Sequence, residues 1–180
     1  MSDPDPAAPP PILEFDPAHG AVIEPSAVIA RRDVPAHAVL CYFQDVIEDV
    51  VAEHGGHQVA RLRSEIGDNP VYEIAFHDRR LAVVHPGVGA PLAAAFLEEL
   101  IALGCRVFMA AGGAGVLVPE VALGHVIVPT AAVRDEGTSY HYLPAGRDAP
   151  ASPEAVAAIV ATLEAHREVF AERFQLNQLI

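Results

Sequence analysis

Two glycine-rich turns are the parts of this sequence best suited to holding a small ligand. The first spans residues 85–89 (His-Pro-Gly-Val-Gly) and the second spans residues 112–115 (Gly-Gly-Ala-Gly). Glycine permits positive φ angles and lets a ligand approach the backbone closely, and free N–H groups at a helix start favour an anion or a polar group. The predicted ligand-binding residues of these turns are Gly87, Val88, Gly89, Gly112, Gly113, Ala114 and Gly115. The alternative interpretation is that the glycines only make tight turns.

The segments around these turns predict a strand, a helix and a second strand. Residues 81–84 form a short apolar run that is typical of a strand buried on both faces. Apolar residues recur at helical spacing from Leu92 to Leu103, and Gly104 stands where a glycine commonly ends a helix. Residues 105–111 form a second apolar run. We expect two adjacent, parallel, buried strands, with both turns at the strand ends where open α/β sheets bind ligands.

Two better-known glycine motifs are excluded by the residues around these turns. The sequence contains no lysine, so neither turn is a phosphate-binding P-loop. Asp135 lies about twenty residues after Gly115, as the ribose-binding acid of a dinucleotide fold would. Only residues 116–124 separate that turn from the next predicted strand, which is too short for a helical crossover.

Two further segments bring side chains with catalytic potential to predicted strand ends. Asp45 follows a predicted strand over residues 39–43 and falls in the first turn of a predicted helix over residues 44–54. Its carboxylate either stabilises the helix N-terminus or serves as a catalytic group. Residues 134–142 are rich in charged, hydroxyl, aromatic and imidazole groups, a density that suits a sugar or base pocket as well as a polar surface loop. From this segment we take Tyr140 as substrate-binding and His141 as catalytic.

The remaining patterns predict a mixed sheet with helices. Residues 57–63 and 70–76 alternate as strands around a turn at 67–70, and a second turn at 78–80 leads into the strand from Leu81. Residues 12–38 are expected to be irregular, with a short strand at 27–30. The predicted core consists of Val83, Val84, Leu92, Phe96, Leu100, Val107, Phe108, Ile127, Val128 and Ile159.

The last third of the chain predicts one strand and one helix. Residues 125–133 form a strand that tolerates Pro129 only near an edge or at a bulge. Ser152 caps a helix that starts at Pro153. Its apolar stripe is Val156, Ile159, Val160 and Leu163, and the spacing continues through Phe170 and Phe174.

Composition predicts one soluble, cytoplasmic α/β domain over residues 12–180, after a disordered proline-rich tail over residues 1–11. The 180 residues are 52% apolar, with no run long enough to span a membrane. Cys41 and Cys105 lie in apolar patterns and are expected to be buried free thiols. The net charge of −13 argues against nucleic acid as a partner, and the histidines and cysteines lack metal-ligand spacing.

Taken in succession, residues 85–91, 98–104, 112–115 and 124–130 resemble the nucleoside phosphorylase and nucleosidase family, nearest its uridine phosphorylase-like branch. The resemblance covers roughly residues 36–145 and implies a three-layer α/β fold with a mixed, largely parallel central sheet. It also implies a homo-oligomer that cleaves the N-glycosidic bond of a nucleoside without a cofactor. In a phosphorylase, which is a pentosyltransferase, the attacking group is inorganic phosphate, whereas in a nucleosidase it is water. The residues do not decide between the two, and they do not show whether the base is a purine or a pyrimidine.

This resemblance also bears on the two catalytic candidates. The family has a Gly-x-Ser-x-His-like segment where this chain has residues 137–141, which favours a site role for His141. Nucleosidases place an acidic residue after their first strand, and Asp45 is comparable to it.

The sequence departs from the family pattern where the family binds phosphate. Residues 24–26 (Glu-Pro-Ser) stand in for a Gly-Asp-Pro-x-Arg motif, and Ala110 and Gly113 stand where the family has an arginine and a serine or threonine. No segment after Leu163 matches the family's ribose-binding Met-Glu pair. The resemblance therefore implies the N-terminal portion of the fold without its C-terminal strands, and slow turnover. The competing hypothesis is a non-catalytic nucleoside-binding or assembly module.

Overall fold

The computed structural model of the chain describes residues 9–18, 20–121, 124–166 and 175–177. The chain divides into two compact units, one of Pro17–Gly113 and one of Met1–Asp16 with Ala114–Ile180. Residues 1–8 of the predicted tail, Phe170 and Phe174 lie outside the described residues. The assignment of residues 12–180 to a single domain stays a prediction.

The unit Pro17–Gly113 is built on a five-stranded mixed sheet with the order β2-β3-β4-β1-β5. The strands are β1 (His37–Cys41), β2 (His57–Ser64), β3 (Gly67–Phe76), β4 (Arg79–Val84) and β5 (Val107–Ala111). The strands β2, β3 and β4 form an antiparallel meander, while β1 pairs in parallel with both β4 and β5. The predicted mixed α/β sheet is confirmed.

The predicted adjacency of the strands within residues 81–84 and 105–111 was wrong. Strand β1 lies between β4 and β5, so that Val39 pairs with Val83 on one side and with Met109 on the other. The two strands are parallel, as expected. The local pattern predicts a strand, a helix and a strand, but it carries no information on whether another strand is inserted between the two.

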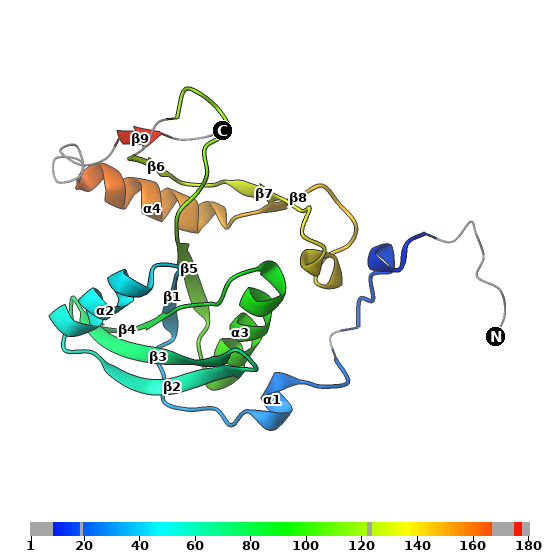
Figure 1. Cartoon of the computed structure of the whole chain (residues 1–180), viewed down its shortest axis with the longest axis horizontal. Helices are drawn as coiled ribbons and strands as arrows, with labels where there is room; N and C mark the ends of the chain where they lie inside the picture. The colour runs from blue at the N-terminus through cyan, green and yellow to red at the C-terminus, as the bar shows by residue number, and fades with distance from the viewer. Residues whose placement is uncertain (1–8, 19, 122–123, 167–174, 178–180) are drawn as a thin grey trace. The chain divides into compact units, whose positions relative to one another are not determined.

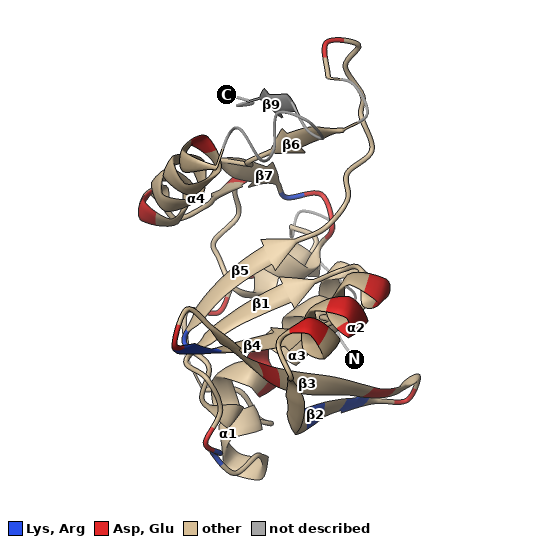
Figure 2. Ribbon diagram, turned by 90° about the vertical axis from the view of Figure 1, so that its left-hand side faces the viewer, with Lys and Arg blue, Asp and Glu red and all other residues tan. Residues whose placement is uncertain are grey.

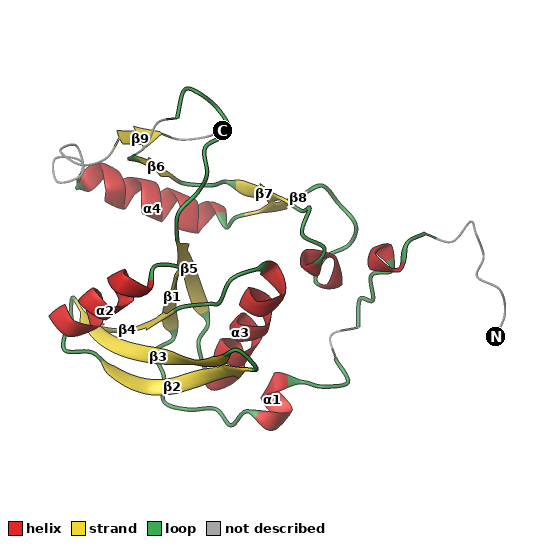
Figure 3. Cartoon of the chain, viewed as in Figure 1, coloured by secondary structure: helices red, strands yellow, loops and turns green. Residues whose placement is uncertain are grey.

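Two helices cover opposite faces of this sheet and make it the middle of three layers. On one face, Ala38 and Leu40 of β1 pack in a cluster with Phe96 of α3 (Ala90–Leu103). On the other face, Val39 and Cys41 pack with Ile47 of α2 (Gln44–Glu53). Successive side chains of a strand point to opposite faces, so a single apolar run in β1 supplies both clusters. Figures 1 and 3 show α2 and α3 beside the sheet.

Most of the predicted core residues are buried or partly buried, in both compact units. Val83, Val84, Phe96, Leu100 and Val128 are buried, and Leu92, Phe108, Ile127 and Ile159 are partly buried. Val107 was wrongly placed in the core, because it is 52% exposed. It lies on β5, the last strand of the sheet, and an apolar run alone does not distinguish an edge strand from a central one.

The turns and the first short element differ from the predicted ones. Residues 67–70, predicted as a turn, begin β3, and the hairpin between β2 and β3 turns instead at residues 65–66. The next turn lies at His77 and Asp78, which both have positive φ. The strand predicted at 27–30 is also wrong, because a short helix α1 (Pro25–Val28) begins at a proline in the position where proline is tolerated.

The described residues of the second unit form two small sheets and the helix α4. Strand β6 (His125–Ile127) pairs in parallel with β9 (Gln175–Asn177), and β7 (Ala131–Val133) pairs antiparallel with β8 (Asp148–Pro150). The single strand predicted at 125–133 is thus interrupted around Pro129, which lacks the N–H that a ladder requires. Two 3₁₀ turns, η1 (Pro11–Leu13) and η2 (Thr138–His141), complete this unit.

Helix α4 (Pro153–Ala165) follows its predicted pattern. Ser152 Oγ accepts a hydrogen bond from the Ala155 N–H at 3.2 Å, which confirms the predicted cap. The helix ends at Ala165, and its least exposed side chains are those of the predicted stripe, Val156, Ile159, Val160 and Leu163. Across the described helices of the chain, none has the length and apolar character to cross a bilayer.

Candidate functional site

The carboxyl end of β1 is a topological switch point of the five-stranded sheet. From β1 the chain passes through α2 to the meander that ends in β4, and from β4 it passes through α3 to β5 on the other side of β1. Because α2 and α3 cover opposite faces, the two connections leave a crevice at this strand end. Ligands of open α/β sheets bind at such positions.

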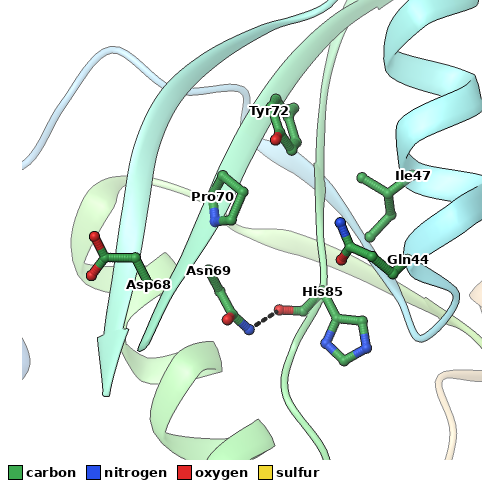
Figure 4. A pocket seen from close by; sticks show the side chains of 7 residues that line it. All are labelled: Gln44, Ile47, Asp68, Asn69, Pro70, Tyr72 and His85. Atoms are coloured by element: carbon green, nitrogen blue, oxygen red, sulfur yellow. Dashed lines mark hydrogen bonds between the residues drawn. The ribbon is translucent and has the colours of Figure 1, made fainter. Parts of the chain in front are cut away.

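A pocket of about 300 Å³ opens at this end of the sheet (Figure 4). Its lining residues are Gln44, Ile47, Asp68, Asn69, Pro70, Tyr72 and His85. Gln44 and Ile47 come from the start of α2, His85 follows β4 directly, and the other four belong to β3. The volume lies at the lower end of the range for small-molecule sites, which is roughly 300–1,000 Å³.

Hydrogen bonds fix the ring of His85 and the amide of Asn69. The Gly87 N–H donates to His85 Nδ1 at 3.1 Å, and Asn69 Nδ2 donates to the His85 carbonyl oxygen at 3.0 Å. Because Nδ1 accepts a hydrogen bond, a neutral His85 carries its proton on Nε2. The antiparallel pairing of Val71 with Val84 sets Asn69 beside the residue that follows β4.

Tyr42 connects the ends of all three parallel strands. It follows β1, and its backbone N–H donates to the Ala111 carbonyl oxygen of β5 at 2.9 Å. Its ring meets the His85 ring edge to face, with 6.0 Å between the ring centroids. A Cβ added to Gly112 would lie 3.1 Å from Tyr42 Cδ2, a tight contact, so glycine at this position favours the close approach of the strand ends.

The first glycine turn packs against the helix that it starts. Gly87 is buried with φ +77°, and a Cβ at this position would lie 2.5 Å from Leu92 Cδ2. Gly89 is the N-cap residue of α3 and has φ +91°, while Val88 is 80% exposed. None of these three residues lines the pocket, and they approach it only through His85. Their part in ligand binding stays a prediction.

The other predicted site residues lie outside the pocket. Asp45 is exposed in the first turn of α2, next to the lining residue Gln44. Gly113 lies two residues after the end of β5, and a Cβ added there would lie 3.4 Å from Phe43 Cζ. The predicted residues Ala114, Gly115, Tyr140 and His141 belong to the second compact unit.

Within that unit, Tyr140 and His141 lie on a loop that is organised by Arg134. The guanidinium of Arg134 is 4.4 Å from the centre of the Tyr140 ring, and its side chain is buried. The Tyr140 hydroxyl donates back to the Arg134 carbonyl oxygen at 3.2 Å. His141 ends η2 and is exposed. The structure therefore gives Tyr140 a packing role and leaves His141 accessible to solvent.

A charged network holds the meander against the segment before β1. Arg80 donates to both Glu73 carboxylate oxygens, at 2.6 and 2.8 Å, and to Asp33 Oδ1 at 2.7 Å. These hydrogen bonds from Arg80 lower the pKa of Glu73 and of Asp33 below their usual values. The network joins β3 and β4, which carry most of the pocket, to the chain that leads into β1.

Sequence reasoning missed most of the residues that line the pocket. His85 is a polar residue directly after a buried strand, and the rule that singled out its glycine neighbours could have identified it. Asn69 was assigned to a turn, and only the register of β3 on β4 brings it beside His85. Tyr72 was expected only as a strand residue.

Sequence comparisons with known proteins point to one protein family. The family model of the phosphorylase superfamily matches residues 36–174 of this chain. A uridine phosphorylase from Treponema pallidum is 31% identical over 121 residues, which are 66% of this chain and 44% of the relative. A uridine phosphorylase from Haemophilus influenzae is 37% identical over 79 residues, which are 44% of this chain and 31% of the relative. The chain thus spans less than half the length of these curated relatives.

A solved structure shows the same fold. The purine nucleoside phosphorylase from Toxoplasma gondii, in complex with immucillin-H, superposes with a TM-score of 0.68 at 23% sequence identity. The superposition covers 89% of this chain and 62% of that structure. At this identity the likeness concerns the fold alone.

Proposed function

Because the chain belongs to the phosphorylase superfamily, with a uridine phosphorylase-like sequence, we propose that its pocket at the end of β1 binds a nucleoside and that the protein acts on the N-glycosidic bond. The resemblance drawn from residues 85–91, 98–104, 112–115 and 124–130 is confirmed at the level of the family. The observation that carries the proposal is the pocket at the switch point, where His85, Asn69 and Gln44 come together.

The reaction places specific demands on such a site. As the C1′–N bond breaks, its electron pair moves to the base, the sugar carbon becomes cationic, and an oxygen of phosphate or water bonds to C1′. The leaving base must accept a proton or a hydrogen bond. The Nε2–H of His85 supplies a donor in the pocket, and Asp45 and His141 remain the proposed acid–base groups.

We propose that turnover by this chain is slow. Phosphoryl groups are held by arginine side chains and backbone N–H groups, and Ala110 stands at the strand end where the family is expected to have an arginine. The same observation favours a second candidate function, a module that binds a nucleoside without cleaving it. Whether the pocket takes a purine or a pyrimidine nucleoside is tested by comparing uridine with guanosine in the titration described below.

We also propose that the protein self-associates. Val107 and Met109 lie on the edge strand β5 and are 52% and 44% exposed, although they are apolar. An apolar edge strand is a common site of pairing between chains. Light scattering at micromolar concentration is expected to give a mass above that of the monomer, and a monomeric mass would contradict this.

The proposed function is tested by calorimetric titration of the 180-residue chain with uridine and with guanosine, beside an assay of base release with and without phosphate. We expect binding of at least one nucleoside, and His85→Ala should weaken it. His57→Ala, an exposed histidine on β2 outside the pocket, is the matched control. Binding without base release would support the non-catalytic module. A folded protein that binds neither nucleoside would refute the proposal.

A further inference from the structure

We propose that Asn69 is a positioning residue, which acts on the ligand of the pocket through the ring of His85. Asn69 holds the main chain of His85, the main chain holds the ring, and the ring offers its Nε2–H to the ligand. This inference rests on the proposed function for the identity of the ligand, and it adds the residue that keeps the donor of His85 in place. Asn69 also lines the pocket itself, so direct contact with the ligand is the alternative to be separated by experiment.

The side chain of Asn69 continues the contact between β3 and β4 beyond their last paired residues. The ladder between these strands ends where Val71 pairs with Val84, and Asn69 is paired with Leu62 of β2 on its other side. The carbonyl oxygen of His85 accepts a hydrogen bond from Asn69 Nδ2 at 3.0 Å, the dashed line in Figure 4. A partly buried carbonyl group needs such a partner, so this bond fixes the main chain where β4 ends.

The residues from His85 to Gly87 convert this main-chain anchor into a fixed ring. A residue before proline is restricted to extended conformations, and Pro86, which is buried, has no N–H to compete for the ring. The next N–H along the chain, that of Gly87, donates to His85 Nδ1 at 3.1 Å. A rotation of the main chain at His85 would therefore carry this N–H away from the ring nitrogen.

The ring of His85 is held by neutral groups, although carboxylates lie nearby in the chain. Its edge-to-face partner is the ring of Tyr42, with 6.0 Å between the centroids. Asp68, the charged lining residue, is paired with Arg61 at 2.6 Å. The acidic residues of α2, red in Figure 2, are exposed: Asp45, Glu48, Asp49 and Glu53. A carboxylate at Nδ1 would draw the ring proton to that nitrogen, whereas a backbone N–H keeps Nδ1 as an acceptor.

The pocket therefore presents a fixed and neutral N–H donor at His85. The hydrogen bonds of His85 to Asn69 and Gly87 use its carbonyl oxygen and its Nδ1, so neither occupies Nε2. As the electron pair of the C1′–N bond moves to the base, a donor of this kind binds an acceptor atom more strongly. A donor that surrounding hydrogen bonds already hold in place needs no rearrangement at that moment.

Nitrogen NMR of the full 180-residue chain tests the positioning without any ligand. The ring nitrogens of His85, assigned by their loss in His85→Ala, should show the shifts of a pure Nε2–H tautomer when the ring is neutral. In Asn69→Ala these shifts should move toward the average of the two tautomers, and amide exchange at Gly87 should speed up by about threefold or more. Asn69→Asp, which keeps the shape but has no N–H to donate, should behave in the same way.

The matched control is Gln58→Ala, which removes an exposed carboxamide on β2 outside the pocket. It should change neither the His85 shifts nor the exchange at Gly87. Amide exchange in β1 should stay unchanged in every variant, which shows that the sheet remains folded.

A double-mutant cycle separates positioning from direct contact. In calorimetric titration, Asn69→Ala and His85→Ala should each weaken uridine binding by about three- to tenfold. In the His85→Ala background, Asn69→Ala should change the affinity by less than about twofold, because Asn69 acts through a ring that is no longer there. Gln58→Ala should leave the affinity unchanged.

The outcomes also separate this inference from the proposed function. Additive losses in the cycle would overturn the inference, since they would show that Asn69 contacts the ligand itself. Unchanged His85 shifts in Asn69→Ala would overturn it as well and leave the nucleoside function standing. A His85 tautomer that depends on Asn69, in a folded chain that binds neither uridine nor guanosine, would uphold the positioning and contradict the proposed function.

Discussion

The substitution Gly87→Ala should strongly destabilise the unit Pro17–Gly113, because this glycine meets two requirements at once. Its φ of +77° costs an L-residue roughly 1–2 kcal/mol. The new Cβ would also lie 2.5 Å from Leu92 Cδ2 and 2.6 Å from Leu92 Cγ, and such overpacking costs roughly 1–3 kcal/mol. We expect a loss of about 2–5 kcal/mol, a large share of the roughly 5–15 kcal/mol that stabilises a typical domain.

Native-state hydrogen exchange is the suitable assay for this loss, because the chain has two compact units and a single unfolding transition need not report on both. The exchange rates of the β1 and β4 amides give the free energy of unfolding of the sheet that carries the pocket. Exchange in α4, which belongs to the other unit, should stay unchanged and serves as the internal control.

A second glycine separates strain from steric conflict. Gly89 also has positive φ, at +91°, but an added Cβ would meet nothing within 4 Å. In double-mutant cycles with Leu92→Ala, Gly87→Ala should show a coupling of about 1–3 kcal/mol, and Gly89→Ala should show almost none. Equal coupling at both positions would refute the reasoning that Leu92 restricts the first turn.

Two further predictions concern the charged groups that hold each unit together. Arg80 lowers the pKa of Glu73 below its usual 4.5, so the stability from this pair is present above that pH and is lost as the pH falls through the folded-state pKa. Urea unfolding between about pH 3 and pH 6 should therefore show a decline in stability that is shallower in Arg80→Gln, and identical pH profiles would contradict it. Arg134→Met should speed amide exchange at Tyr142 and Leu143 by about tenfold or more, because the hydrogen bonds of the buried guanidinium to Ser139 and to nearby carbonyl oxygens are lost. The control variant Arg147→Met changes an exposed arginine and should leave this exchange unchanged.

The sequence by itself was sufficient for the local elements of this protein. Helix α3 was predicted from apolar spacing and from Gly104, and the start of α4 from Ser152 and Pro153. The first glycine turn and the strands before both glycine-rich segments were also correctly located, whereas residues 112–115 follow β5 without forming a turn. These features depend on residues within a few positions of one another, so periodicity and capping preferences are enough to predict them. The same motifs sufficed to assign the family.

Only the tertiary structure decided how these elements meet. The insertion of β1 between β4 and β5, the exposure of Val107 and the contact of Asn69 with His85 all depend on strand order and register. Hydrogen bonds between strands join backbone groups that are the same in every residue but proline, so several pairings suit the same apolar runs. The choice among them is made by packing between distant segments, and that packing places Gln44, Asn69 and His85 around one pocket.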